Sequence, residues 1–246
     1  MIAEVASSSR SSNGKTTTPS SVDRGNRLVR TSSADHIALH IRTLIFDGVL
    51  RPGMRVPQDA IAEDLGVSRI PVREALIVLE HEGWVTIEMH RGAYINALDK
   101  RAVHDHYELF GLIYGFAAQR ALARAADDLP NVLADLQKKF ADATEPAEQQ
   151  QQSIAFHAAI VRAAASPRII VVLRGMSAMV PGDFFEMVPD AVEVEKRGFA
   201  AIVRAMKNND GERASAEYSK MMRQVGNKVI TLFDERSLFD QKVPST

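Results

Sequence analysis

The chain has 246 residues, with 30 Lys and Arg against 31 Asp and Glu, and it contains no cysteine. This length suffices for two domains, the net charge of -1 provides no general attraction for nucleic acid, and the lack of cysteine excludes disulfides, thiolate metal sites and a cysteine nucleophile. No apolar run approaches the roughly 20 residues that cross a bilayer, and the N-terminus has no apolar signal-peptide core. We therefore expect a cytoplasmic protein with no membrane partner.

The charges are unevenly distributed along the chain. Residues 1–33 carry five basic and two acidic groups and thirteen Ser or Thr, and such a segment cannot bury enough apolar surface to offset its ordering entropy. It is predicted to be a disordered basic tail, either an arm that touches phosphates or an inert leader. Residues 34–98 carry six basic and nine acidic groups, and residues 99–246 carry nineteen and twenty.

The sequence pattern of residues 34–98 predicts three helices followed by a hairpin. A first helix starts near Ser32 and ends at Gly48, because apolar side chains recur at helical spacing before that glycine. A short helix over about 58–65 ends at Gly66, and a third helix over 69–82 follows Ser68, a favourable N-cap residue. Two strand-like runs, 84–89 and 93–96, flank the turn 90–92.

Two short helices joined by Gly66-Val67-Ser68 have helix-turn-helix spacing. On a helical wheel, Arg69 and Arg73 share the exposed face of the third helix, in the half that meets base edges in helix-turn-helix proteins. Arginine suits guanine O6 and N7 or a bidentate phosphate contact. Arg91, beside Gly92 at the hairpin tip, is placed to reach a neighbouring groove. The alternative is a solvated amphipathic helix beside a surface hairpin.

Four segments resemble the winged helix-turn-helix of GntR-family transcription regulators: LRPG at 50–53, LGVSRIPVREAL at 65–76, EGWV at 82–85 and RGAYI at 91–95. The resemblance implies operator DNA as a partner. The residues that it and the exposed helix face assign to DNA binding are Ser68, Arg69, Ile70, Arg73, Arg91 and Gly92. Asp59 departs from the pattern, because fatty-acid regulators of this family often have a basic residue there. The resemblance therefore implies no DNA contact from Asp59.

The rest of the chain predicts an antiparallel bundle of six or so helices, with apolar stripes at 103–117, 129–140, 154–161, 199–206 and 214–232. It resembles the FCD domain of the FadR subfamily at Glu108-Leu109-Phe110, at Ala155-Phe156-His157 and over 205–214. The expected fold class is mainly α, with a winged helix-turn-helix domain at 34–98 and an all-α helical domain for effector binding and dimerisation at 99–240.

Many FCD domains hold a metal through one Asp and three His, and by the resemblance these positions are Ser153, His157, Phe199 and Met221 here. One imidazole and a hydroxyl cannot hold a divalent cation tightly, so we expect no metal and no cofactor. A family Arg and its Glu partner are likewise replaced, by Ile113 and Ala117. These six residues predict an apolar effector pocket for a hydrophobic or acyl-type ligand, with His157 and Ser153 as polar handles. A collapsed pocket is the alternative.

The function that follows is a dimeric, ligand-responsive transcription regulator, expected to be a repressor, with operator DNA, a small-molecule effector and a second copy as partners. The effect of ligand binding would be transmitted to the head through Trp84 and through the segment 98–103 between the domains. A regulator whose helical domain only dimerises is the first alternative. An enzyme is not expected, because the chain has no cysteine, no Gly-x-Ser-x-Gly turn and no histidines at metal-ligand spacing.

Overall fold

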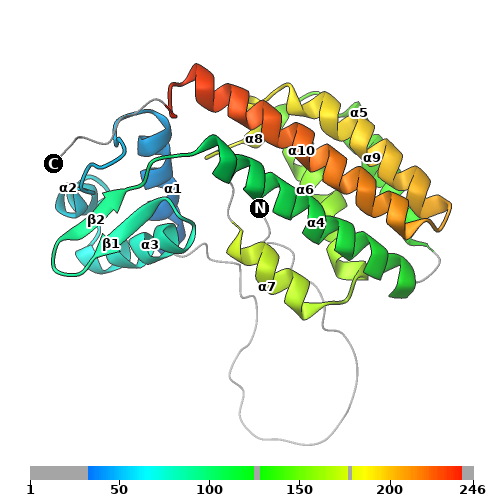
Figure 1. The fold of residues 1–246 in the computed structure, drawn as a ribbon, viewed down its shortest axis with the longest axis horizontal. Helices are drawn as coiled ribbons and strands as arrows, with labels where there is room; N and C mark the ends of the chain where they lie inside the picture. Colours follow the sequence, from blue (N-terminus) through cyan, green and yellow to red (C-terminus); the bar gives the residue numbers. More distant parts are fainter. Residues whose placement is uncertain (1–32, 125–127, 177–178, 240–246) are drawn as a thin grey trace, which may run out of the picture.

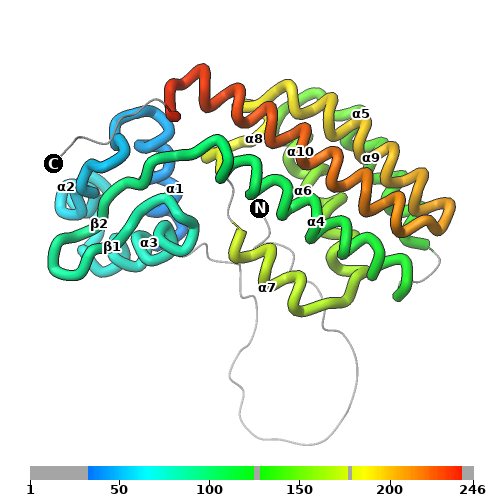
Figure 2. Tube along the Cα trace, viewed as in Figure 1, coloured from blue at the N-terminus to red at the C-terminus, as the bar shows by residue number. Residues whose placement is uncertain are grey.

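The computed structural model describes residues 33–124, 128–176 and 179–239, which form a small head and a larger helical bundle (Figure 1). The predicted basic tail lies outside these residues except for Ser33. Within the described segments, no helix is both long and apolar enough to cross a membrane. The tube in Figure 2 shows α4 (Lys100–Arg124) and α10 (Gly211–Glu235) running side by side through the bundle.

The head consists of three helices and a two-stranded hairpin: α1 (Ser33–Phe46), α2 (Gln58–Asp64), α3 (Arg69–His81), β1 (Val85–Glu88) and β2 (Gly92–Ile95). The strands pair antiparallel, with Val85 opposite Ile95. The apolar stripes of α1 and α3 pack together, and Ile41 and Leu79 are fully buried between them. Gly66, with φ of 64°, makes the tight turn between α2 and α3 that a residue with a Cβ rarely adopts.

The bundle adds five further helices to α4 and α10 among the described residues: α5 (Leu129–Asp142), α6 (Pro146–Ala163), α7 (Pro167–Gly175), α8 (Phe184–Met187) and α9 (Ala191–Lys207). Glycines let α4 and α10 approach closely. A Cβ on Gly111 would lie 2.8 Å from the Cα of Ser219, and a Cβ on Gly226 would lie 2.8 Å from the Cβ of Tyr107. Larger residues at these two positions would push the helices apart.

The predicted fold class, a winged helix-turn-helix followed by an all-α bundle, is confirmed. The apolar stripes missed α7, because its apolar residues run without interruption and show no helical period. In the structure only Ile169 and Leu173 of that run are buried, whereas Val171 and Val172 are exposed. Ser68 directly precedes α3, as predicted, but the expected capping bond is wrong, because its side chain makes none.

The head and the bundle meet at the ends of α1 and α10. Phe46, the last residue of α1, packs edge-on against Phe233 of α10 with 5.7 Å between ring centroids. The Arg236 guanidinium lies 4.3 Å from the centroid of the Phe46 ring, and its Nη1 lies 3.6 Å from Oδ1 of Asp47. Phe46 is buried in the apolar core of the bundle, although it belongs to the first helix of the head.

Candidate nucleic-acid interface and ligand pocket

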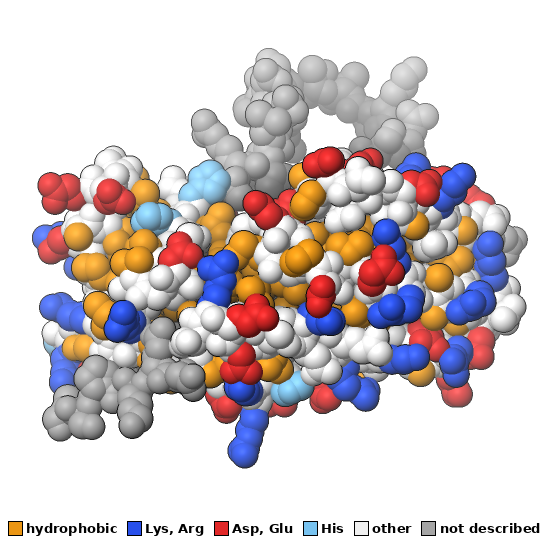
Figure 3. Space-filling view, turned by 90° about the horizontal axis from the view of Figure 1, so that it is seen from above, with side chains coloured by type: hydrophobic (Ala, Val, Ile, Leu, Met, Phe, Trp, Pro, Cys, Tyr) orange, Lys and Arg blue, Asp and Glu red, His pale blue; other side chains and the backbone are white. Residues whose placement is uncertain are grey.

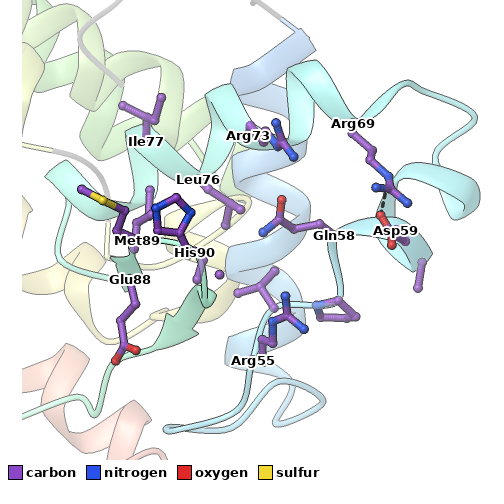
Figure 4. Close-up of a pocket in the computed structure, with 16 residues that line it drawn as sticks. Arg55, Gln58, Asp59, Arg69, Arg73, Leu76, Ile77, Glu88, Met89 and His90 are labelled. Atoms are coloured by element: carbon purple, nitrogen blue, oxygen red, sulfur yellow. Dashed lines mark ion pairs between the residues drawn. The ribbon is translucent and has the colours of Figure 1, made fainter.

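A groove of about 850 Å³ lies between the start of α2, the exposed face of α3 and the hairpin (Figure 4). Arg69 and Arg73 line it from α3, one helical turn apart, and Arg55 lines it from the segment before α2. Figure 4 shows Arg55 and Arg73 directed toward the space around Gln58. Helix α3 and the segment before α2 thus bring three arginine side chains to one concave surface.

Half of the residues predicted to contact DNA line this groove: Arg69, Arg73 and Gly92. The remaining residues of that prediction are not part of its lining: Ser68, Ile70 and Arg91. All three are exposed to solvent and are sequence neighbours of residues that line the groove, and Ile70 is 68% exposed. Arg91 is held at the hairpin turn by Glu88, with 2.8 Å between Nη1 and Oε2. Their contact with DNA stays a prediction.

Sequence reasoning missed Arg55, Gln58 and His90, which line the same groove. Arg55 forms an isolated antiparallel bridge with Tyr94, so the segment before α2 runs beside the hairpin. Its side chain lies against Gly92, where an added Cβ would be 2.7 Å from Arg55 Nε. No local pattern indicates this contact, because it joins two segments that are far apart in the sequence.

Ion pairs divide the arginines of the groove into two groups. Arg69 Nε lies 2.6 Å from Oδ1 of Asp59. In the part of the chain that the structure describes, Arg55 and Arg73 have no carboxylate oxygen within 4.0 Å. These two guanidinium groups can therefore exchange water for phosphate or base oxygens without breaking an ion pair.

The face of the bundle seen in Figure 3 does not reinforce this attraction. On this face, Lys and Arg side chains are mixed with Asp and Glu side chains. The electrostatic potentials of such mixed charges largely cancel, and beyond the Debye length of about 8–10 Å exposed charges are screened by salt. The charges on this face therefore add no attraction to that of the groove in the head.

An aromatic cluster surrounds His157 of α6 in the bundle. The centroid of its ring lies 4.6 Å from that of Tyr114 and 5.4 Å from that of Phe199, and its Nδ1 lies 3.4 Å from the Tyr218 hydroxyl. Its Nε2 is buried and has no hydrogen-bond partner within the described residues. Burial lowers the pKa of His157 to about 3, so the ring is neutral at pH 7. An unpartnered buried nitrogen is a group that a ligand can satisfy.

Glu195 of α9 is a buried polar residue that sequence reasoning missed. Its carboxylate accepts a hydrogen bond of 2.7 Å from the Ser153 hydroxyl. Burial raises the pKa of Glu195 to about 7, although the hydrogen bond from Ser153 opposes this shift. Ser153 stands one turn before His157 on α6, and Glu195 stands one turn before Phe199 on α9. That spacing of four was the signal in the sequence that Glu195 shares a helix face with Phe199.

The structure buries five of the six predicted pocket residues and half-buries Ile113. The five are Ala117, Ser153, His157, Phe199 and Met221. Ring contact brings His157 and Phe199 together, and Met221 fills the space beside Gly198 of α9. Ile113 and Ala117 lie on α4, on either side of Tyr114 along the chain.

The donor atoms present do not fit a divalent metal ion. The positions matched to the family's ligands provide one imidazole, a hydroxyl that donates to Glu195, a phenyl ring and a thioether. Structural and catalytic sites for zinc use three or four nitrogen, oxygen or thiolate ligands. Across residues 33–124, 128–176 and 179–239, no group of three or more His, Asp or Glu is arranged to hold a metal.

Two family descriptions match this chain: "Bacterial regulatory proteins, gntR family" over residues 33–95 and "FCD domain" over residues 105–224. The HTH-type transcriptional regulator Rv0043c of Mycobacterium tuberculosis is 45% identical over 102 residues, which are 42% of this chain and 41% of that protein. The gluconate operon transcriptional repressor of Bacillus subtilis is 29% identical over 145 residues, covering 55% of this chain and 57% of that protein.

Among solved structures, E. coli McbR/YncC has a TM-score of 0.56 at 20% identity and covers 83% of this chain and 99% of that chain. At this identity the likeness shows the fold alone. The match with Rv0043c spans about two fifths of the length of that relative.

The two matched segments correspond to the two parts of the molecule described above. The first contains the groove lined by Arg55, Arg69 and Arg73, and the second contains the cluster around His157. The chain therefore has a winged helix-turn-helix that matches the gntR family of bacterial regulatory proteins over residues 33–95, followed by a segment that matches the FCD domain over residues 105–224.

Proposed function

We propose that this chain is a transcription regulator of the FadR subfamily, not an enzyme, and that it binds operator DNA through the groove of the head. The observation that carries the proposal is Arg73. It lies on the exposed face of α3, lines the groove between that helix and the hairpin, and has no carboxylate within 4.0 Å among the described residues. A recognition helix places such a side chain against base edges in the major groove, where arginine reads guanine.

Selection from a random duplex library by the full-length protein tests this function. Because the proposed regulator is a dimer, the enriched sequence is expected to be an inverted repeat. Arg73→Ala is expected to weaken binding to that duplex by about 1–3 kcal/mol. Arg91→Ala is expected to have a smaller effect that is similar on all sequences, since Glu88 already engages this side chain.

Fluorescence anisotropy at one fixed salt concentration measures both variants, because affinity for DNA depends strongly on salt. Arg168→Ala, which removes an exposed arginine from α7, is the matched control and should leave binding unchanged. Unaltered affinity in Arg73→Ala would show that the recognition face lies elsewhere.

The proposed regulator is a homodimer that acts as a repressor. An exposed apolar stripe on α4 supports dimerisation. It consists of Leu109 (51% exposed), Leu112 (60%) and Phe116 (44%). Their spacing of three and four places them in one apolar stripe, and exposed apolar stripes mark places where a partner packs. Repression is supported by the gluconate operon repressor among the relatives.

The FCD domain of the proposed regulator binds a small effector without a metal ion. Support comes from the aromatic surroundings of His157 and from its unpartnered Nε2. Apolar walls with one or two convergent polar groups favour ligands with an apolar body and a single polar end. A hydrophobic or acyl-type effector fits this description, with His157 and the Ser153–Glu195 pair as its polar contacts.

Thermal unfolding with a panel of fatty acids and acyl-CoA esters tests the effector. At least one apolar acid is expected to raise the Tm of the wild type, because ligand that binds only the folded state stabilises it. His157→Leu should abolish that increase, and His36→Leu, at an exposed position of α1, should keep it. No increase with any compound would favour a regulator whose bundle only dimerises. Calorimetric titration with zinc, nickel and manganese should show no stoichiometric submicromolar binding.

A further inference from the structure

We propose that Asp59 is a positioning residue for Arg69, and that it sharpens the sequence discrimination of the head while weakening its general affinity for DNA. The inference rests on the proposed DNA-binding function. It concerns how this chain reads sequence rather than whether it binds DNA. The juxtaposition behind it is a carboxylate at the start of α2 that holds the first side chain of α3.

The Asp59–Arg69 pair spans the helix-turn-helix. Asp59 is the second residue of α2 and Arg69 the first residue of α3, and the carboxylate Oδ1 lies 2.6 Å from the guanidinium Nε (Figure 4). Both side chains line the groove, and both are well exposed, at 69% and 64%. The pair therefore stands in the space that DNA would occupy, and it fixes the direction of a side chain that otherwise rotates freely.

The geometry of the guanidinium explains how the pair helps recognition. An arginine carries five N–H donors in a planar fork. Asp59 takes the donor on Nε, which leaves the donors on the two terminal nitrogens of Arg69 for another partner. Bidentate contact with guanine O6 and N7 needs two parallel donors of this kind. By holding the inner edge, Asp59 reduces the side-chain freedom that Arg69 must lose on binding a guanine.

The charge of Asp59 acts in the opposite direction on general affinity. A carboxylate in the groove repels phosphates, and non-specific binding depends almost entirely on phosphate contacts. Arg55 and Arg73, which have no ion pair among the described residues, supply the attraction. Asp59 therefore raises discrimination by ordering Arg69 for the correct base, whereas its charge lowers the affinity for every sequence alike.

Asp59→Asn in the full-length protein tests the proposal, because it removes the charge and keeps the size of the side chain. Binding is measured on the duplex that the wild type selects and on a random-sequence duplex of equal length. The variant is expected to bind the random duplex a few-fold more tightly and to lower the ratio of specific to random affinity about fivefold or more, as expected for a weakened bidentate base contact.

Asp64→Asn is the matched control. Asp64 is the last residue of α2, its side chain is 72% exposed, and its Oδ2 lies 3.8 Å from Nε2 of His40. The Asp64→Asn variant loses the same charge from the same helix, at a position that does not line the groove. Its ratio of specific to random affinity should therefore stay at the wild-type value. In an Arg69→Ala background, Asp59→Asn should cause no further loss of the ratio, because the residue that it positions is gone.

Two outcomes would overturn the inference. If Asp59→Asn changed the affinity for both duplexes by the same factor, the carboxylate would act only through its charge. If the loss of discrimination persisted in the Arg69→Ala background, Asp59 would read DNA directly. A wild-type chain that enriches no sequence would instead refute the proposed function itself, and the two failures are therefore distinguishable.

Discussion

Replacing Glu195 by glutamine is expected to stabilise the protein by about 3 kcal/mol at pH 8 and to change its stability little at pH 4. Burial raises the pKa of Glu195 from 4.5 to about 7 in the folded protein. Below pH 4.5 the carboxyl is protonated in both states. As the pH rises through 4.5 and then 7, the unfolded chain loses this proton more readily, so the folded state loses stability. Glutamine has no proton to lose and can still accept the hydrogen bond from Ser153.

Denaturant unfolding of both proteins between pH 4 and pH 8 measures this difference. His157, whose pKa burial lowers to about 3, destabilises the folded state below pH 6.5, but it is present in both proteins and cancels in the comparison. Glu193→Gln, at a side chain of α9 that is 66% exposed, is the control and should follow the wild-type pH profile. A Glu195→Gln protein with the same profile as the wild type would show that Glu195 does not carry a raised pKa.

Phe46→Ala is expected to lower the stability of the junction between head and bundle by about 3–5 kcal/mol, the usual loss for a buried phenylalanine. The side chain is 3% exposed, packs against Phe233 and carries the Arg236 guanidinium on its ring. Because it is the residue of α1 that enters the core of the bundle, its loss removes shared packing. Calorimetry should therefore resolve two unfolding transitions in the variant where the wild type unfolds in one.

Leu39→Ala provides the comparison for this prediction. Leu39 lies on the same helix but is 40% exposed, and surface truncations usually change stability by less than about 0.5 kcal/mol. Its melting curve should overlay that of the wild type. If Phe46→Ala shifted unfolding no more than Leu39→Ala does, the head would not be anchored through this contact.

The same junction places α10 between the proposed effector site and the head. Its middle carries Tyr218 and Met221, next to the proposed effector site, and its end carries Phe233, which contacts the head. Sequence reasoning had assigned this route to Trp84 and residues 98–103. Trp84 is buried inside the head, whereas Leu98 packs against both cores. An effector would alter DNA binding through α10 only if it favours one placement of the head over another.

The head was largely predictable because its signals are local. Helical spacing puts Arg69 and Arg73 on one face of α3 whatever else the chain does, and Gly66, with its positive φ, marks the turn before it. The fold class followed from the same periodicity. The helix α7 was missed for the same reason, since an uninterrupted apolar run has no period, and only its neighbours decide which side is buried.

The amino-acid sequence by itself therefore determined the class of the fold and the helix face on which Arg69 and Arg73 lie. The tertiary structure alone decided which side chains work together. It placed Arg55 against Gly92, joined Asp59 to Arg69, and buried Glu195 with Ser153 as its hydrogen-bond donor. The physical reason is that helical and turn patterns depend on neighbours along the chain, whereas ion pairs, buried hydrogen bonds and pKa shifts depend on segments that only packing brings together.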